Sequence, residues 1–252
     1  MPRGRKARWR PWWPSIRTAR RRLPPDNASR SRRLKASGKP LSLKISEIFL
    51  SLQGETSRVG LPTVFVRLTG CPLRCVWCDT AYAFAGGRTM TLPDILAEVA
   101  RHDVRHVCVT GGEPLAQPAC LALLSELCDT GYAVSLETSG ALDIGGVDQR
   151  VARIVDLKAP GSGESDRNLW ANLSLLNSGD EIKFVLAHRA DYEWARQVIV
   201  ERRLADVCPL LFSPVAGELA ASTLAEWILA DRLPVRFQLQ LHKVLWGNMR
   251  GK

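Results

Sequence analysis

The chain has 252 residues, 46% of them hydrophobic and 24% charged, a composition typical of a soluble globular protein with one large core. Its formal charge of +10 would suggest a nucleic-acid partner, but residues 1–40 alone carry +13 and the other 212 residues carry −3. No apolar run approaches the roughly 20 residues of a membrane span, and no apolar signal-peptide stretch follows the basic start. We therefore expect no membrane insertion and no basic nucleic-acid-binding fold from residue 41 onward.

Residues 1–40 form a separate compositional segment. They are rich in Arg, Pro and Ser and show neither helical nor strand periodicity, so we predict a disordered basic extension. With Trp9, Trp12 and Trp13 as stacking residues, it would suit an RNA-binding or membrane-surface arm, and otherwise it is a dispensable extension. Nucleic acid is expected as a partner only through this segment. Residues 41–252 are predicted to form the catalytic domain.

From Leu41 onward, β-rich runs alternate with amphipathic stretches. Helical patterns cover residues 91–102, 118–131, 191–203 and 224–232, with Thr91 as an N-cap and Gly131 after a helix C-terminus. This alternation predicts an α/β fold with a mostly parallel sheet and a ligand site at the carboxyl ends of the strands. The predicted strands are Ile45–Leu52, Thr63–Thr69, His106–Thr110, Ala133–Glu137, Ile154–Lys158, Ile182–Leu186, Pro209–Ser213 and Val235–Gln240.

The stretch GCPLRCVWCDT, residues 70–80, holds three of the seven cysteines. The odd number of cysteines and the absence of a signal peptide indicate a reducing compartment, so we expect a cytoplasmic protein. Cys71, Cys75 and Cys78 lack the fourth ligand that a structural zinc site requires. Three thiolates on one loop instead fit a 4Fe-4S cluster in which one iron has no protein ligand. The cysteines at 108, 120 and 128 fit small buried apolar residues.

A second motif, TGGEPL, covers residues 110–115 at the end of the next predicted strand. Together with the C-x3-C-x2-C spacing, it resembles the radical S-adenosylmethionine superfamily. The resemblance implies that the open iron binds the amino and carboxylate groups of S-adenosylmethionine and that one electron releases a 5′-deoxyadenosyl radical. Gly111 and Gly112 allow a close backbone approach to a ligand, and Glu113 is suited to accept hydrogen bonds from a ligand ammonium.

Further stretches between Leu43 and Gly251 resemble the family of 7-carboxy-7-deazaguanine synthases. They are ISEIFLSLQGETSRVGLPTVFVRLTGC, WCDT, ETSG, DLKAPGSGE, EIKFVLAHRADYEWA and VRFQLQLHKVLWGNMRG. The resemblance implies an incomplete (β/α) barrel of the radical S-adenosylmethionine type and a homodimer. It implies conversion of 6-carboxy-5,6,7,8-tetrahydropterin to 7-carboxy-7-deazaguanine with loss of ammonia, as in queuosine biosynthesis. Mg²⁺ and a reducing partner such as flavodoxin or ferredoxin are implied as well.

The same resemblance assigns roles to individual residues. A carboxylate such as Glu55 is suited to accept from an amino-pyrimidinone edge, and Arg67 can hold a carboxylate bidentately or form an internal ion pair. Thr80 matches the Mg²⁺ ligand, which would share the ion with substrate oxygens and waters. His242 is either a substrate-site residue or a partly buried capping histidine. The predicted substrate residues are Leu52, Gln53, Gly54, Glu55, Arg67, Thr110 and His242, and the predicted cofactor residues are Gly112, Glu113, Glu137, Thr138, Ser139 and Lys158.

Three alternatives remain at this level. A glycyl-radical-enzyme activase would share the cluster and the GGEP motif (residues 111–114). It would need neither the LQGE segment (residues 52–55) nor Thr80. A zinc-stabilised nucleic-acid-binding module would account for the cysteines and the basic segment but not for GGEP. A homologue that has lost activity would retain both motifs.

Overall fold

The computed structural model describes residues 40–252. The predicted basic extension, residues 1–40, lies outside the described residues except for Pro40, so its predicted disorder and binding role stay predictions. The described part contains one nine-stranded sheet. The strands are β1 (Ser42–Leu52), β2 (Pro62–Leu68), β3 (Arg88–Thr91), β4 (His106–Gly111), β5 (Ala133–Thr138), β6 (Ala152–Asp156), β7 (Glu181–Leu186), β8 (Leu210–Pro214) and β9 (Arg236–Phe237).

The strand order is β3-β1-β2-β4-β5-β6-β7-β8-β9, and from β2 to β9 all neighbours pair in parallel. The strand β1 is antiparallel to both β2 and β3. Because β3 and β9 are the two ends of the order and do not pair with each other, the sheet is open. The prediction of an incomplete barrel with a mostly parallel sheet is confirmed.

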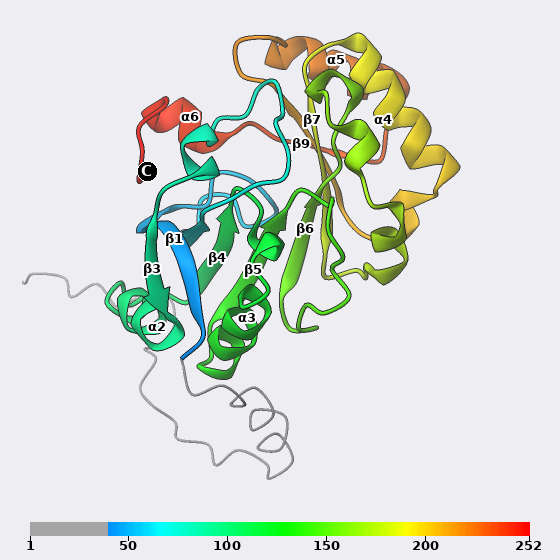
Figure 1. Ribbon diagram of the computed structural model, residues 1–252. Coiled ribbons are helices and arrows are strands. Elements are labelled where there is room, and N and C mark those ends of the chain that lie inside the picture. The colour runs from blue at the N-terminus through cyan, green and yellow to red at the C-terminus, as the bar shows by residue number, and fades with distance from the viewer. Residues whose placement is uncertain (1–39) are drawn as a thin grey trace, which may run out of the picture. The chain divides into compact units, whose positions relative to one another are not determined.

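Five α-helices accompany the strands in the described residues, and four of them match the predicted patterns. They are α2 (Leu92–Ala100), α3 (Cys120–Asp129), α4 (Arg189–Glu201), α5 (Ala221–Asp231) and α6 (Leu241–Trp246). The Thr91 hydroxyl caps α2 by accepting from the Asp94 N–H, and Gly131 follows α3 at φ +94°. In Figure 1, α2 lies beside β3 and β1 at one end of the order, α3 lies beside β5 in the middle, and α4 and α5 lie beside the last strands.

The apolar faces of these helices bury one continuous core against the sheet. Leu123, Leu124 and Leu127 of α3 are fully buried, as is Tyr192 of α4. Burying large apolar side chains is the main term that stabilises such a domain. Short 3-10 helices in the connections cover residues 81–84, 114–116, 160–162, 165–167, 170–175 and 204–206.

Three elements differ from the prediction. The predicted strand Val235–Gln240 is reduced to Arg236–Phe237, and beyond it the side chains of Gln238 and Gln240 bond to Thr56 and Glu55. The strand β3 was not predicted, since only one of its four residues is buried. The helix α6 was not predicted either, and none of its residues is fully buried.

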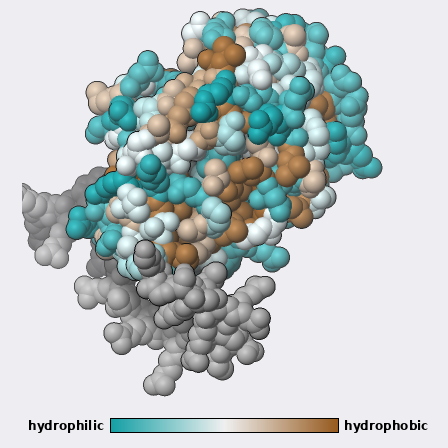
Figure 2. All heavy atoms as spheres, viewed as in Figure 1, coloured by the Kyte–Doolittle hydropathy of each residue, from teal (hydrophilic) through white to brown (hydrophobic). Residues whose placement is uncertain are grey.

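Apolar side chains on the surface and the lengths of the helices bear on membrane insertion. Figure 2 shows apolar and polar side chains interspersed over the face in view. None of the helices within residues 40–252 has the length and apolar content needed to cross a membrane.

Candidate active site

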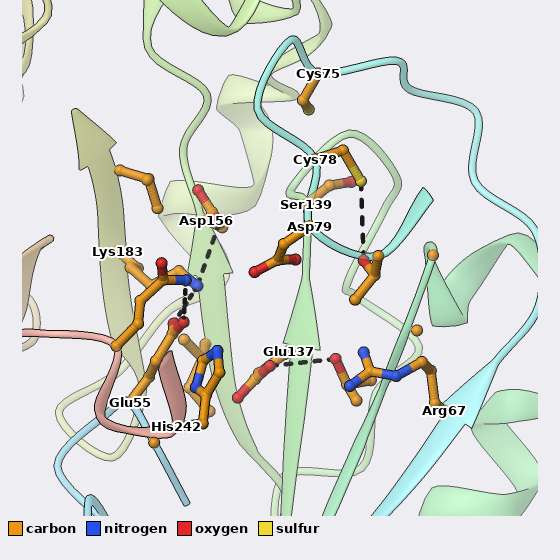
Figure 3. Close-up of a pocket in the computed structure, with 18 of the residues that line it drawn as sticks. Glu55, Arg67, Cys75, Cys78, Asp79, Glu137, Ser139, Asp156, Lys183 and His242 are labelled. Atoms are coloured by element: carbon orange, nitrogen blue, oxygen red, sulfur yellow. Dashed lines mark hydrogen bonds and ion pairs between the residues drawn. The ribbon is translucent and has the colours of Figure 1, made fainter. Parts of the chain in front are cut away.

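A cavity opens beside the carboxyl ends of β2, β4, β5 and β6, where a parallel α/β sheet places its ligands. Its wall brings together side chains and backbone from the whole domain (Figure 3). All the predicted site residues except Glu113 line it: Leu52, Gln53, Gly54, Glu55, Arg67, Cys71, Cys75, Cys78, Thr80, Thr110, Gly112, Glu137, Thr138, Ser139, Lys158 and His242.

The cysteine loop between β2 and residue 80 is held by backbone hydrogen bonds. The N–H of Thr69 donates to the Lys44 carbonyl at 2.9 Å, that of Gly70 to Ala83 at 2.8 Å, and that of Val76 to Ser162 at 3.0 Å. The loop therefore has a defined shape that does not depend on bonds made by its three cysteines.

All three cysteines of this loop are free thiols and partly accessible from the cavity. Burial raises the pKa of the Cys71 and Cys75 thiols, so a metal is needed to stabilise their thiolate forms at neutral pH. Within residues 40–252, no three His, Cys, Asp or Glu side chains converge on one metal ion. Each thiolate of a 4Fe-4S cluster binds a different iron, so three thiolates on one loop would hold three irons.

The GGEP turn packs directly on this loop. A Cβ at Gly112 would lie 2.2 Å from the Gly70 carbonyl oxygen, and a Cβ at Gly111 would lie 2.5 Å from that of Leu68. The N–H of Glu113 donates to Gly70 O at 2.7 Å. Both glycines are therefore required for contact between the two backbones.

Glu113 is the one predicted site residue that does not line the cavity, and its side chain is fully buried. Its carboxylate accepts from the N–H of Ser139 at 2.7 Å, from the hydroxyls of Ser139 and Thr138, and from the N–H of Leu115. These bonds fix the end of β5, and the role of Glu113 as an acceptor from a ligand ammonium stays a prediction.

The LQGE segment follows β1, so it leaves the sheet beside the start of β2 and reaches across to later strands. The side-chain amide of Gln53 donates to Glu137 Oε1 at 3.2 Å, and the hydroxyl of Thr110 donates to Glu137 Oε2 at 3.2 Å. Glu137, predicted as a cofactor residue, thus lies between two predicted substrate residues.

Arg67 lines the cavity and also forms an ion pair inside the protein. Its Nε lies 2.8 Å from Glu47 Oε1, an oxygen that also accepts from the Tyr82 hydroxyl at 2.7 Å. Burial opposes the charge of Arg67, but contacts with Tyr82 and Glu47 outweigh burial and raise the pKa of its guanidinium. One edge of Arg67 is therefore fixed, and its remaining N–H groups are the donors available for a ligand.

A row of alternating charges runs across the cavity. Lys183 Nζ contacts Glu55 Oε2 at 2.5 Å and Asp156 Oδ2 at 3.4 Å, and Lys158 Nζ lies 3.1 Å from the same Asp156 oxygen. The other Asp156 oxygen, Oδ1, is buried and has no hydrogen-bond partner in the described part of the chain. In Figure 3, Glu55 and Lys183 lie toward one end of the cavity and the cysteines toward the other.

The electrostatic state of Glu55 is defined by this row. Burial alone would raise the pKa of Glu55, but the charge and hydrogen bond of Lys183 outweigh burial, and Gln240 and His242 add to the effect. The pKa of the Glu55 carboxyl is lowered to about 2. For Lys183, burial is likewise outweighed, by Glu55, Asp156 and Glu137, and its pKa lies well above the usual range. Both groups are thus charged at neutral pH.

The C-terminal segment covers the cavity from one side. A Cβ at Gly54 would lie 2.3 Å from His242 Nδ1, so the imidazole packs directly on this glycine. The N–H of Leu241 donates to the Gly54 carbonyl at 2.9 Å. Lys243 Nζ lies 3.0 Å from Asp79 Oδ2, which ties α6 to the cysteine loop.

Sequence reasoning missed several cavity residues, namely Asp79, Asp156, Lys183, Gln240 and Lys243. All five lie inside the quoted stretches, and two of them stand beside predicted ligands: Asp79 precedes Thr80 in WCDT, and Asp156 is two positions before Lys158 in DLKAPGSGE. These neighbours could have pointed to the two aspartates. In the sequence, Lys183 is a single charged residue in a predicted strand, and its partner Glu55 is 128 positions away. Nothing local in the sequence links such a pair.

The chain is similar in sequence to proteins of one known family. The family model described as the Radical SAM superfamily matches residues 65–200. The chain is 50% identical to 7-carboxy-7-deazaguanine synthase of Chlorobaculum tepidum over 213 residues, 83% of this chain and 97% of the relative. It is 44% identical to the synthase of Koribacter versatilis over 219 residues, covering 81% of this chain and 97% of the relative.

A solved structure agrees with these relatives. The crystal structure of QueE from Escherichia coli superposes with a TM-score of 0.67 at 25% identity, covering 80% of this chain and 95% of that one. None of these matches supports a glycyl-radical-enzyme activase or a zinc-stabilised nucleic-acid-binding module.

Proposed function

The chain belongs to the radical S-adenosylmethionine superfamily and, within it, to the family of 7-carboxy-7-deazaguanine synthases, and from this membership we propose how its cavity works. The protein is a radical enzyme that converts 6-carboxy-5,6,7,8-tetrahydropterin to 7-carboxy-7-deazaguanine with loss of ammonia. One observation carries the detailed proposal: three loop cysteines, the GGEP turn and the LQGE segment all line one cavity.

The cluster belongs at the cysteine end of this cavity. Cys71, Cys75 and Cys78 would hold three irons, which fits free thiols on a loop whose backbone is already held in place. When bound, the cluster and S-adenosylmethionine supply the 5′-deoxyadenosyl radical. Gly112 also lines the cavity, so the backbone of the turn is available to a ligand there.

The cofactor would lie between the cluster and the row of charges. Thr138 and Ser139 line the cavity at the end of β5, and their hydrogen bonds to Glu113 hold this part of the wall in position. Lys158 offers a cation for a ligand carboxylate, and the unpartnered oxygen of Asp156 offers an acceptor for a ligand hydroxyl or ammonium.

The pterin would lie at the opposite end, against the LQGE segment. Glu55 and Glu137 accept hydrogen bonds from its amino-pyrimidinone edge, and the free N–H groups of Arg67 donate to it. Leu52 and His242 close the cavity around the reacting ring and exclude water from it. These contacts orient the hydrogen that is abstracted and do not take part in the radical step.

We further propose Mg²⁺ at Thr80, shared with the substrate carboxylate and waters. A single hydroxyl ligand suits a hard cation that keeps much of its hydration. A homodimer and a flavodoxin or ferredoxin as electron donor complete the proposal. The cytoplasm is the proposed compartment, in agreement with seven unpaired cysteines within residues 40–252.

The test is an anaerobic assay with a reductant, S-adenosylmethionine and carboxytetrahydropterin, in which the deazaguanine product is identified by mass. Reconstituted protein is expected to carry about four irons per chain and to form the product. The variant with Cys71, Cys75 and Cys78 all replaced by Ala is expected to do neither. Iron retained by that variant, stoichiometric zinc in the native protein, or no product from a loaded native enzyme would each contradict the proposal.

A further inference from the structure

Lys183 is the residue that connects the two ends of the cavity, and the sequence analysis assigned it no role. It lies on β7, its side chain is 11% exposed, and its ammonium contacts Glu55 on one side and Asp156 on the other. We propose that Lys183 is a positioning residue for the reaction, one that holds Glu55 as a fixed, acceptor-only carboxylate for the N–H donors of the pterin. This inference rests on the proposed substrate site.

The first step of the argument is geometric. One oxygen of Glu55 accepts from Lys183 and the other from the side-chain amide of Gln240 at 2.8 Å. Because each carboxylate oxygen has two lone pairs, each keeps one acceptor position for a ligand. The two donors come from different elements, β7 and the segment before α6, so the plane of the carboxylate is held from both sides.

The second step concerns charge. Glu55 is 7% exposed, and burial of a lone carboxylate favours its protonated form. The charged and titratable groups that face Glu55 are Lys183 from β7 and His242 from α6. Four such groups face Lys183. They are Glu55 after β1, Glu137 on β5, Asp156 at the end of β6 and Lys158 in the loop after β6. Lys183 is the permanent cation in contact with Glu55 among these described residues.

The third step concerns recognition. An amino-pyrimidinone edge presents N–H donors, which require acceptors opposite them. A protonated Glu55 would place an O–H group against an N–H group and would lose a charge-assisted hydrogen bond. Loss of Lys183 therefore weakens substrate binding mainly by allowing Glu55 to take up a proton.

The sign of the pH effect follows from the lowered pKa. In the native enzyme Glu55 stays ionised down to about pH 2, so its titration is absent from any practical assay range. In Lys183→Met the burial of Glu55 is no longer compensated, and its pKa rises toward the assay range. Binding of the pterin is then retained at high pH and lost as the pH falls.

The test uses the reconstituted holoenzyme, with kcat and KM for carboxytetrahydropterin measured from about pH 5.5 to 9. For Lys183→Met we expect KM to rise at least tenfold at the acidic end and to recover toward high pH, with a smaller change in kcat. Lys183→Arg keeps the charge and is expected to keep the native pH profile. The matched control is Arg153→Met. Arg153 lies on the neighbouring strand β6 and forms a buried ion pair with Asp180, and neither residue lines the cavity. It should lower thermal stability while the pH profile of KM stays native.

A double-mutant cycle covers the case in which Lys183→Met does not fold. In Glu55→Gln the side chain cannot ionise, so adding Lys183→Met is expected to change KM less than twofold and to leave it independent of pH. The proposal is overturned if Lys183→Met keeps the native KM profile, if Lys183→Arg behaves like Lys183→Met, or if the double variant is much weaker than Glu55→Gln. A native enzyme without product would instead overturn the function itself.

Discussion

Gly54 is the residue at which one methyl group has the largest expected effect on the substrate end. We expect Gly54→Ala to fold but to lose roughly tenfold or more in kcat/KM, because its Cβ would lie 2.3 Å from His242 Nδ1 and 3.0 Å from His242 N. The measurement is steady-state kinetics with the pterin, alongside thermal unfolding. Gly145→Ala is the control, since its Cβ would meet only side chains, at 3.1 Å or more, away from the cavity. Equal kinetics for both variants would refute a tight fit of His242 on Gly54.

Substitution of Thr80 distinguishes the role of the proposed Mg²⁺ ion from that of the cluster. We expect Thr80→Ala to keep its iron and its affinity for S-adenosylmethionine but to form product roughly ten- to a hundredfold more slowly, because a charge-assisted contact in a desolvated site is lost. Omission of Mg²⁺ should slow the native enzyme strongly and this variant much less. Iron content and product formation with and without Mg²⁺ are the measurements. If Mg²⁺ matters equally to both proteins, Thr80 does not hold the ion.

Single residues were predictable where their chemistry was contiguous in sequence. The cysteine spacing and the LQGE segment each fall within a few positions, so their shared cavity could be anticipated. Glu113 shows the limit: the sequence places a carboxylate beside two glycines, but it does not reveal that the side chain turns away, toward Thr138 and Ser139. Which side of a turn a side chain faces depends on tertiary contacts.

At the scale of elements, Glu113 links β4 to β5. Its buried carboxylate accepts from two backbone N–H groups and two hydroxyls, and no cation of residues 40–252 forms an ion pair with it. In Glu113→Gln one acceptor oxygen becomes an NH₂ group that faces these donors, which should lower stability by about 1–3 kcal/mol. We expect weaker S-adenosylmethionine binding as well, since Ser139 loses its anchor.

Anaerobic calorimetric titration of S-adenosylmethionine and thermal unfolding check this expectation. Glu98→Gln on the outer part of α2 is the control for loss of one carboxylate charge. If Glu113→Gln binds the cofactor as tightly as the native protein, Glu113 does not shape the cofactor wall.

Elements were predictable where local pattern and tertiary environment agree. Runs such as HVCVT and AVSLET are β-branched and apolar, and they form the central strands β4 and β5. The segment at residues 235–240 carries a similar pattern, yet only Arg236–Phe237 form a strand, and the side chains of Gln238 and Gln240 bond to Thr56 and Glu55, 182 and 185 positions away. Such long-range hydrogen bonds leave no periodicity in the sequence.

At the scale of the whole molecule, residues 40–252 hold a continuous apolar core and the cavity with the predicted site residues on its wall. A chain that begins at Pro40 is therefore expected to fold and to turn over at the native rate. Because the segment before it carries +13, its removal should weaken binding to polyanions and make that binding less salt-dependent. Thermal unfolding, product formation and retention on heparin at several salt concentrations are the measurements. An unfolded or inactive truncated protein would show that the segment belongs to the domain.

The backbone contacts that hold the cysteine loop have a consequence for purification of the protein in the presence of oxygen. Its shape comes from backbone bonds to Lys44, Ala83 and Ser162 and from the contact of Gly112 with Gly70, none of which involves iron. In small zinc domains, by contrast, metal binding and folding are a single event. Protein isolated under oxygen should thus emerge colourless but folded, with a melting temperature close to that of the brown form. Iron and sulfide added later in a glove box would then restore activity without any refolding step.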